Sequence, residues 1–206
     1  MEKCFINSDV LGAERSFCMY YGGTDVFSSD EVKKIKNIGD SLSSETAKTF
    51  GQGEESSARK GKVAWLPRYS ESTQWIYKKL LSITEQANNE LWKFDLIGFW
   101  EDAQYTSYEA SSKKDKKEKG DFYDYHLDID GAYGVQRKIS VVIQLTDPSE
   151  YEGGELELRT SNASYIAEKS EGSVLLFPSF CLHRVHPVTK GKRNSLVLWV
   201  SGMPFK

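Results

Sequence analysis

The second half of the chain is a series of short apolar segments separated by turn signals, and this rhythm constrains the fold more than any other feature. In KISVVIQLT, apolar residues stand at every second position, as in a β-strand with one buried face: Ile139, Val141, Ile143 and Leu145. Similar segments follow at close spacing, divided by DGAYG, DPSEYEGG and VTKGKR. The series predicts a double-stranded β-helix over residues 96–206, a jelly-roll or cupin-like core of antiparallel strands.

Two amphipathic helices are expected in the first half of the chain. Residues 28–42 begin with the capping candidates Ser29 and Asp30 and then place apolar residues at helical spacing. Residues 72–92 carry a second apolar stripe behind Ser72 as N-cap. The stretch between them, residues 43–62, is rich in Ser, Gly, Glu and Lys and is expected to be a loop. The fold class is therefore mainly β with flanking helices (α+β), the N-terminal helices packing on one sheet.

Length and composition fit a single domain over residues 1–206, with a helical front and first strands in 1–95 and the jelly roll in 96–206. Three scattered cysteines argue against a disulfide framework and a zinc knuckle. A net charge of −3 gives no sign of a nucleic-acid or anionic-membrane partner. The N-terminus lacks a signal-peptide core and no run approaches a membrane span, so we expect a cytoplasmic protein.

One low-complexity tract, SSKKDKKEKG at residues 111–120, interrupts two strand-like segments. Charged runs of this kind usually form solvated, flexible loops, and we expect a flexible basic loop at this place. Because the tract leads directly into the segment that carries the first histidine, a lid beside a site is the alternative interpretation.

The stretch DYHLDID, residues 124–130, contains the first indication of chemistry. On a strand, residues i and i+2 point to the same face, so His126 and Asp128 present an imidazole and a carboxylate side by side. Such a pair alone is more often surface decoration than a metal site. Asp124 shares their parity and is a candidate for orienting His126.

A third ligand can come from either of the remaining histidines, His183 or His186. They differ by three positions, so on an ideal strand they face opposite sides and cannot both serve one metal. Two histidines and one carboxylate on one face of an octahedral metal leave the other positions open, as in non-haem Fe(II) oxygenases. Arg193 begins an apolar strand ten residues after His183, and an arginine aimed into a barrel needs an anion, which its planar fork binds bidentately when it is a carboxylate.

Three stretches resemble the 2-oxoglutarate and Fe(II)-dependent oxygenases, within them the prolyl 4-hydroxylase-like branch of PKHD-type hydroxylases: FYDYHLDID, RKISVVIQLTDPSEYEGGELEL and LLFPSFCLHRVHPVTKGKRNSLVLWVSG. The resemblance implies that residues 1–206 form one oxygenase domain and that iron is bound by His126, Asp128 and His183, the histidine directly before RV. It further implies that Arg193 holds the far carboxylate of 2-oxoglutarate. Tyr108 resembles a tyrosine that helps hold this cosubstrate, with Tyr123 and Gln144 as alternatives.

The activity implied by the resemblance is hydroxylation of an unactivated C–H bond with Fe(II), 2-oxoglutarate and O2, yielding succinate and CO2, with ascorbate as a further expected cofactor. The resemblance favours a peptidyl proline in a protein or peptide partner. Three alternatives stay open: a small-molecule or amino-acid hydroxylase of the same superfamily, a non-catalytic jelly roll that binds a metal or small acid, and a zinc hydrolase with the same ligands.

Overall fold

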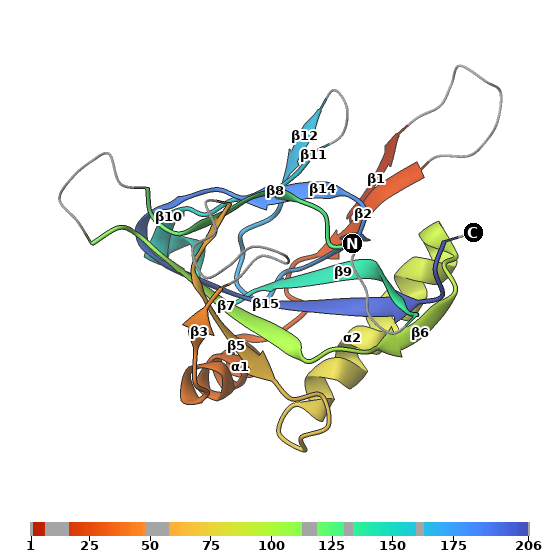
Figure 1. Ribbon diagram of the computed structural model, residues 1–206, viewed down its shortest axis with the longest axis horizontal. Helices are drawn as coiled ribbons and strands as arrows, with labels where there is room; N and C mark the ends of the chain where they lie inside the picture. Colours follow the sequence, from red (N-terminus) through yellow and green to blue (C-terminus); the bar gives the residue numbers. More distant parts are fainter. Residues whose placement is uncertain are drawn as a thin grey trace.

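Two antiparallel sheets face each other in the computed structural model, which describes residues 2–6, 17–47, 58–112, 119–129, 134–159 and 163–205 (Figure 1). The large sheet has the order β1 (Glu2–Ile6), β2 (Phe17–Gly23), β13 (Val174–Pro178), β9 (Gln136–Gln144), β15 (Val188–Gly202), β7 (Ala103–Glu109), β5 (Lys62–Leu66) and β3 (Glu45–Thr46). Two further strands also pair with β15, namely β6 (Leu96–Phe99) and β10 (Tyr151–Gly153), the latter after a 3-10 turn at Pro148–Glu150.

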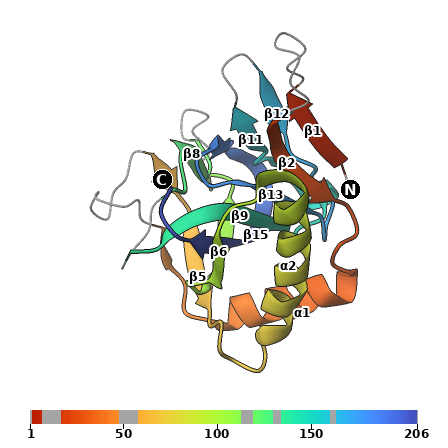
Figure 2. The ribbon, with the colours of Figure 1, turned by 90° about the vertical axis from the view of Figure 1, so that its right-hand side faces the viewer.

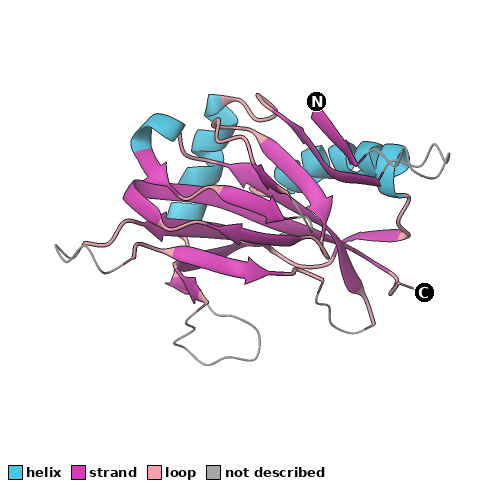
Figure 3. Ribbon diagram, turned by 90° about the horizontal axis from the view of Figure 1, so that it is seen from above, coloured by secondary structure: helices cyan, strands magenta, loops and turns pink. Residues whose placement is uncertain are grey.

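The small sheet covers the other side of the interior, as Figure 3 shows from above. Its order is β12 (Ser164–Ile166), β11 (Leu156–Arg159), β14 (Leu182–Val185), β8 (Phe122–His126) and β4 (Arg59–Lys60). The double-layered β core predicted for residues 96–206 is confirmed. The front of the chain contributes more strand than its weak periodicity indicated, since β3, β4 and the start of β5 lie in the stretch expected to be a loop.

Both predicted helices are present and lie on the same side of the large sheet (Figure 2). α1 (Ser29–Ser41) is capped by Ser28, one residue before the expected candidates, because Glu31 stands three residues later and completes a reciprocal capping box with Ser28. α2 (Gln74–Ala87) begins after Thr73 rather than Ser72 and continues into a π-helical turn at Asn88–Trp92. No helix among the described residues is long and apolar enough to cross a membrane.

Alternation along β9 divides the molecule into two cores. One set of its side chains packs with the helices: Ile139, Val141 and Ile143. The intervening residues, Ser140, Val142 and Gln144, face the small sheet, and Val142 belongs to a second core together with residues of β11 and β13. The apolar half of the strand therefore anchors the helical layer, and its smaller, more polar half is buried in the interior between the sheets.

The lysine-rich tract lies mostly outside the described residues, since 113–118 are among those the structure does not describe. Residues 111–112 and 119–120 at its two ends have no regular structure. They connect β7 to β8, so the tract stands between the strand of Tyr108 and the strand of His126. The prediction of a flexible basic loop stays a prediction.

The surroundings of Gly39 in α1 show how tightly the helical layer is packed. A Cβ at this position would lie 2.5 Å from Cγ of the Tyr105 ring, which is itself fixed by a hydrogen bond from its hydroxyl to Asp40. Gly39→Ala gains about 1 kcal/mol of helix propensity but loses about 1–3 kcal/mol by overpacking. We expect net destabilisation in chemical denaturation, whereas Ala at the exposed Asn37 should be neutral or stabilising. A Gly39→Ala protein as stable as wild type would contradict this packing.

Candidate metal centre

Three potential metal ligands meet where β8 and β14 lie side by side. His126 ends β8 and pairs directly with His183 of β14 across the antiparallel ladder. Asp128 follows two residues after His126. Its Oδ1 lies 3.7 Å from Nε2 of His126, and its Oδ2 lies 3.4 Å from Nε2 of His183. The three ligand atoms all lie within 4.8 Å of one another, so one cation can contact all of them.

Both imidazoles are held in the tautomer that a metal requires. Nδ1 of His126 lies 2.7 Å from the carbonyl oxygen of Asp124, and Nδ1 of His183 lies 2.9 Å from that of Cys181. A carbonyl only accepts hydrogen bonds, so each Nδ1 carries a proton, and Nε2 is the nitrogen that each ring presents to the shared space. Asp124 orients His126 as predicted, but through its backbone, because its carboxylate accepts from the amide of Tyr125 instead.

Asp128 reaches the cluster from beyond the end of β8, so the expectation that it shares a strand with His126 is wrong. Its position is set by contacts to other strands. The Asp128 amide donates to the carbonyl of Ser179 at 2.8 Å, and the Ser140 hydroxyl donates to the Asp128 carboxylate at 2.7 Å. Ser140 lies on the interior face of β9, which explains why this face carries a small polar residue at that point.

The electrostatics of the cluster suit a cation. Burial, and next the neighbouring His183, lowers the pKa of His126 to about 3, so this imidazole is neutral at physiological pH. Burial would raise the pKa of the Asp128 carboxyl, but His183 outweighs it and holds that pKa below its usual value. Burial likewise lowers the pKa of His183, and Asp128 reverses the direction by favouring the protonated ring. The group that draws a positive charge into the site is therefore the ionised carboxylate of Asp128.

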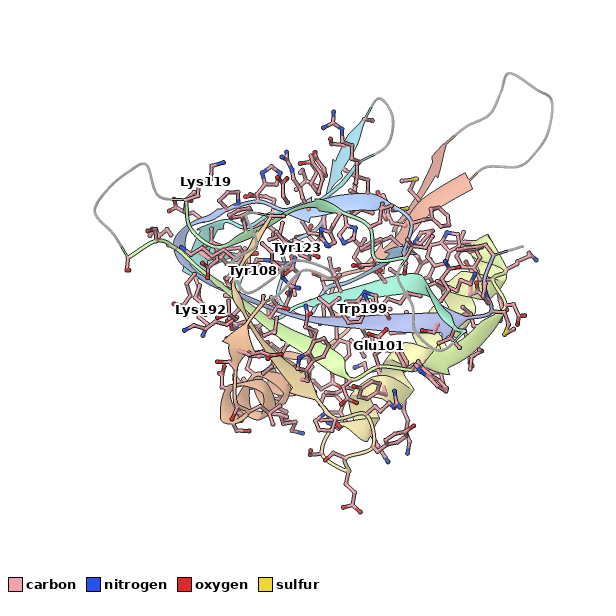
Figure 4. All side chains as sticks on the ribbon, viewed as in Figure 1. Glu101, Tyr108, Lys119, Tyr123, Lys192 and Trp199 are labelled. Atoms are coloured by element: carbon pink, nitrogen blue, oxygen red, sulfur yellow. The ribbon has the colours of Figure 1, made fainter. Side chains whose placement is uncertain are left out.

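Aromatic rings enclose the cluster. Tyr123 stacks on His126 with ring centroids 3.4 Å apart, and the guanidinium of Arg59 lies 4.4 Å from the Tyr123 centroid. Trp199 of β15 lies near Asp128, and its ring centroid lies 3.8 Å from the guanidinium carbon of Arg137. Figure 4 shows Tyr123 between the sheets and Trp199 on the strand that carries Arg193.

Arg193 lies deeper in the same interior and is 1% exposed. Its guanidinium donates to Gln144 at 2.9 Å and reaches Ser195 at 3.5 Å, but no carboxylate of the described residues forms an ion pair with it. A buried cation without a counterion is costly, so this pocket is organised for an anion that binds from outside the chain. The neutral partner Gln144 leaves the guanidinium its full charge.

Tyr108 lies opposite Arg193 on β7, with its ring centroid 5.8 Å from the guanidinium carbon, and Figure 4 places it between the two sheets. Tyr123 belongs instead to the surroundings of His126. Of the three side chains considered for contact with the anion, Tyr108 and Gln144 are therefore beside Arg193, whereas Tyr123 is beside the metal cluster. Gln144 was named in the sequence only through the family resemblance, and the structure places it beside Arg193.

His186 is not in the cluster. Its Nε2 lies 2.6 Å from the carboxylate of Glu157, which also accepts from Arg184 and Tyr125. Burial would raise the pKa of Glu157, but hydrogen bonds, first from Ser164 and then from Arg184 and His186, lower it to about 2. His186 is thus part of a separate ion-pair network, as the parity argument against a shared site with His183 requires.

Comparisons with known proteins agree with this geometry. Residues 103–201 match the model of the 2OG-Fe(II) oxygenase superfamily. A PKHD-type hydroxylase of Idiomarina loihiensis is 36% identical over 86 residues, covering 42% of this chain and 39% of that protein. One of Synechococcus sp. is 39% identical over 85 residues, covering 41% and 39%. The chain thus spans about 39% of the length of these curated relatives.

Solved structures share the fold over most of the chain. A Pseudomonas putida prolyl-4-hydroxylase superposes with a TM-score of 0.64 at 18% identity, covering 90% of this chain and 93% of that one. A Trichoplax adhaerens prolyl hydroxylase, solved with a hypoxia inducible factor peptide fragment, gives 0.70 at 19% identity, covering 88% and 82%. Residues 103–201 are therefore similar in sequence to the 2OG-Fe(II) oxygenase superfamily, and the solved structures share the fold of the chain. The curated relatives that this part of the sequence matches are named PKHD-type hydroxylases.

The two late histidines provide a matched test of the metal centre. We expect His183→Ala to weaken binding of a divalent probe such as Co(II) by more than about 100-fold, because loss of a ligand should exceed the 10- to 100-fold cost of losing an outer partner. His186→Ala should bind the probe like wild type, because His186 contacts Glu157. Calorimetric titration of both folded variants measures the difference, and equal affinities would remove His183 from the centre.

Proposed function

We propose that this protein is an Fe(II)- and 2-oxoglutarate-dependent dioxygenase that hydroxylates an unactivated C–H bond. The observation that carries the proposal is the pairing, inside one interior, of an open three-ligand cluster with a buried arginine that has no counterion. A cupin-like metal-binding protein needs only the first. A zinc hydrolase can use the same ligands, but it gives no reason to bury Arg193.

The position of the two parts suits a five-carbon diacid. On β9, Ser140 contacts Asp128 and Gln144 contacts Arg193, and these two positions are separated by roughly 13 Å at about 3.3 Å per residue. The side chains at both positions extend into the space between them. A keto-acid end at the metal and a far carboxylate at Arg193 would therefore occupy the interior between them.

The chain's own residues bind, orient and exclude water, as expected when the cofactor carries the reactive chemistry. His126, Asp128 and His183 would hold Fe(II), which supplies O2 activation coupled to decarboxylation of the cosubstrate. Arg193 would bind the far carboxylate, with Tyr108 and Gln144 beside it. Trp199 and Tyr123 would shield the ligands from bulk water and keep Asp128 and His126 in place. No side-chain general base is needed.

For the substrate, we propose a peptidyl proline in a protein or peptide. Its support is the similarity to proteins named PKHD-type hydroxylases and the fold shared with prolyl hydroxylases, one of them solved with a peptide fragment. A free amino acid or another small molecule is the alternative within the same chemistry. Ascorbate as an auxiliary reductant and a cytoplasmic location stay predictions.

Anaerobic titration of the protein with Fe(II) and 2-oxoglutarate tests the proposal directly. We expect a visible charge-transfer band from the bidentate chelate, followed by succinate when O2 is admitted. His126→Ala and Asp128→Ala should give neither signal while keeping the fold. Tight zinc binding without a band in the wild type would favour the hydrolase or the binding protein.

Arg193→Gln separates a role in binding from a role in folding. Removing the charge partner of a buried carboxylate should weaken 2-oxoglutarate binding by about 2–5 kcal/mol. The ligand-free variant should be at least as stable as wild type, because it no longer buries a cation without a counterion. Both quantities can be measured on one sample by calorimetry and thermal unfolding. Unchanged affinity would place the cosubstrate elsewhere, and a large loss of stability would show that Arg193 is structural.

A further inference from the structure

We infer that Tyr151 is a second cosubstrate-positioning residue, whose phenolic hydroxyl donates a hydrogen bond to the carboxylate that Arg193 holds. The inference rests on the proposed function and extends it to a side chain outside the metal cluster and outside the strands that carry Arg193, Gln144 and Tyr108. Tyr151 belongs to β10, the short strand that pairs with β15 near its beginning.

The hydroxyl of Tyr151 is buried and has no hydrogen-bond partner. The residue is 3% exposed, and its oxygen is among the few buried polar side-chain atoms of the described residues that lack a partner. Buried hydroxyls are nearly always satisfied, so an unsatisfied one requires an explanation. Nε of Arg193 is another buried atom without a partner.

The two unsatisfied groups belong to the same pocket. Burial has the largest effect on the Tyr151 phenol and keeps its pKa above the usual value, although the nearby charge of Arg193 acts to lower it. The phenol is therefore protonated at neutral pH and is a donor. A guanidinium only donates, so it cannot accept the phenol proton. Two adjacent donors without an acceptor match the two oxygens of one carboxylate.

The local backbone explains how both side chains fit. The pairing of β10 with β15 shifts register between Glu152 and Gly153, and Gly154 then adopts a φ of 64°. A Cβ at Gly154 would lie 3.0 Å from Cδ of Arg193 and 3.4 Å from Cε2 of Tyr151. The glycine therefore leaves open the space in which the two side chains approach each other. The glycines of the segment EGGELEL thus shape the anion pocket.

The Tyr151 ring is also restrained by Lys169. Nζ of Lys169 lies 4.4 Å from the ring centroid, and this ammonium donates to the carbonyl of Gly153 and to Glu155. These hydrogen bonds keep the Lys169 ammonium in place, and it restrains the Tyr151 ring through a cation–π contact. The hydroxyl is presented to Arg193 by a ring with little freedom to turn away.

The experiment compares Tyr151→Phe with wild type using two ligands, 2-oxoglutarate and 2-oxopentanoate, which carries a methyl group in place of the far carboxylate. Dissociation constants are measured anaerobically on the Fe(II)-loaded protein from the charge-transfer band, and on the Mn(II)-loaded protein by calorimetry. Losing a hydrogen bond to a charged group should weaken 2-oxoglutarate binding roughly 10- to 100-fold. Binding of 2-oxopentanoate should change less than about 2-fold, because the lost contact involves only the carboxylate.

The outcomes separate this inference from the proposed function. Wild type that binds no 2-oxoglutarate would refute the proposed function itself. Wild type that binds it while Tyr151→Phe binds it equally well would refute only the role of Tyr151. Equal weakening for both ligands would show that Tyr151 acts through the fold, a result that lowered thermal stability of the ligand-free variant would accompany. Tyr151→Leu allows the same comparison if the Phe variant does not fold.

Discussion

The alternation of side chains across the large sheet is the constraint on which the rest of the structure depends. Alternate residues in the central parts of β9 and β15 pack against the helices, and these residues are apolar, as in Ile143 and Leu198. The other set faces the small sheet, where it includes Ser140, Gln144 and Arg193. A one-residue shift of β15 would turn Arg193 toward α1 and α2. A one-residue shift of β9 would place isoleucine at the metal cluster. Burial of the apolar face thus fixes the register of both strands, and this register determines where the metal-binding and anion-binding side chains lie.

The metal cluster is organised before any ion binds. Backbone carbonyls on two strands determine which imidazole nitrogens are free, and Ser140 on a third strand holds the Asp128 carboxylate. Ligands arranged in this way lose little conformational freedom on binding, which favours affinity and keeps the coordination geometry fixed. Among the described residues, the cluster consists of these three ligands without a fourth His, Cys, Asp or Glu, and the Tyr123 ring covers one face of His126.

Part of this site could be predicted from strand period and parity, and part from the family resemblance. The i, i+2 spacing paired His126 with Asp128, parity excluded a shared role for His183 and His186, and the resemblance selected His183. Asp128 was identified correctly although its strand was not, because a residue just past a strand end can still return to the same site. Tyr151 was missed because its burial and its unsatisfied hydroxyl depend on β10 pairing with β15, a contact between positions about 40 residues apart. The strands β3 and β4 were missed because two-residue strands have no period to detect.

The deep pocket and the metal cluster contribute differently to stability. Asp128 favours the protonated ring of His183 and accepts a hydrogen bond from Ser140, so this cluster can remain folded without an ion. Arg193 and Tyr151 have no such compensation, and their unsatisfied donors make the ligand-free interior less stable than an apolar one of equal volume. A ligand that satisfies both donors therefore removes this cost, and it stabilises the folded chain by an amount that rises with the ratio of ligand concentration to Kd. Affinity for the anion and stability of the empty barrel are thus opposed at these two residues, and the apolar core between the large sheet and the helices is what allows the chain to tolerate the cost.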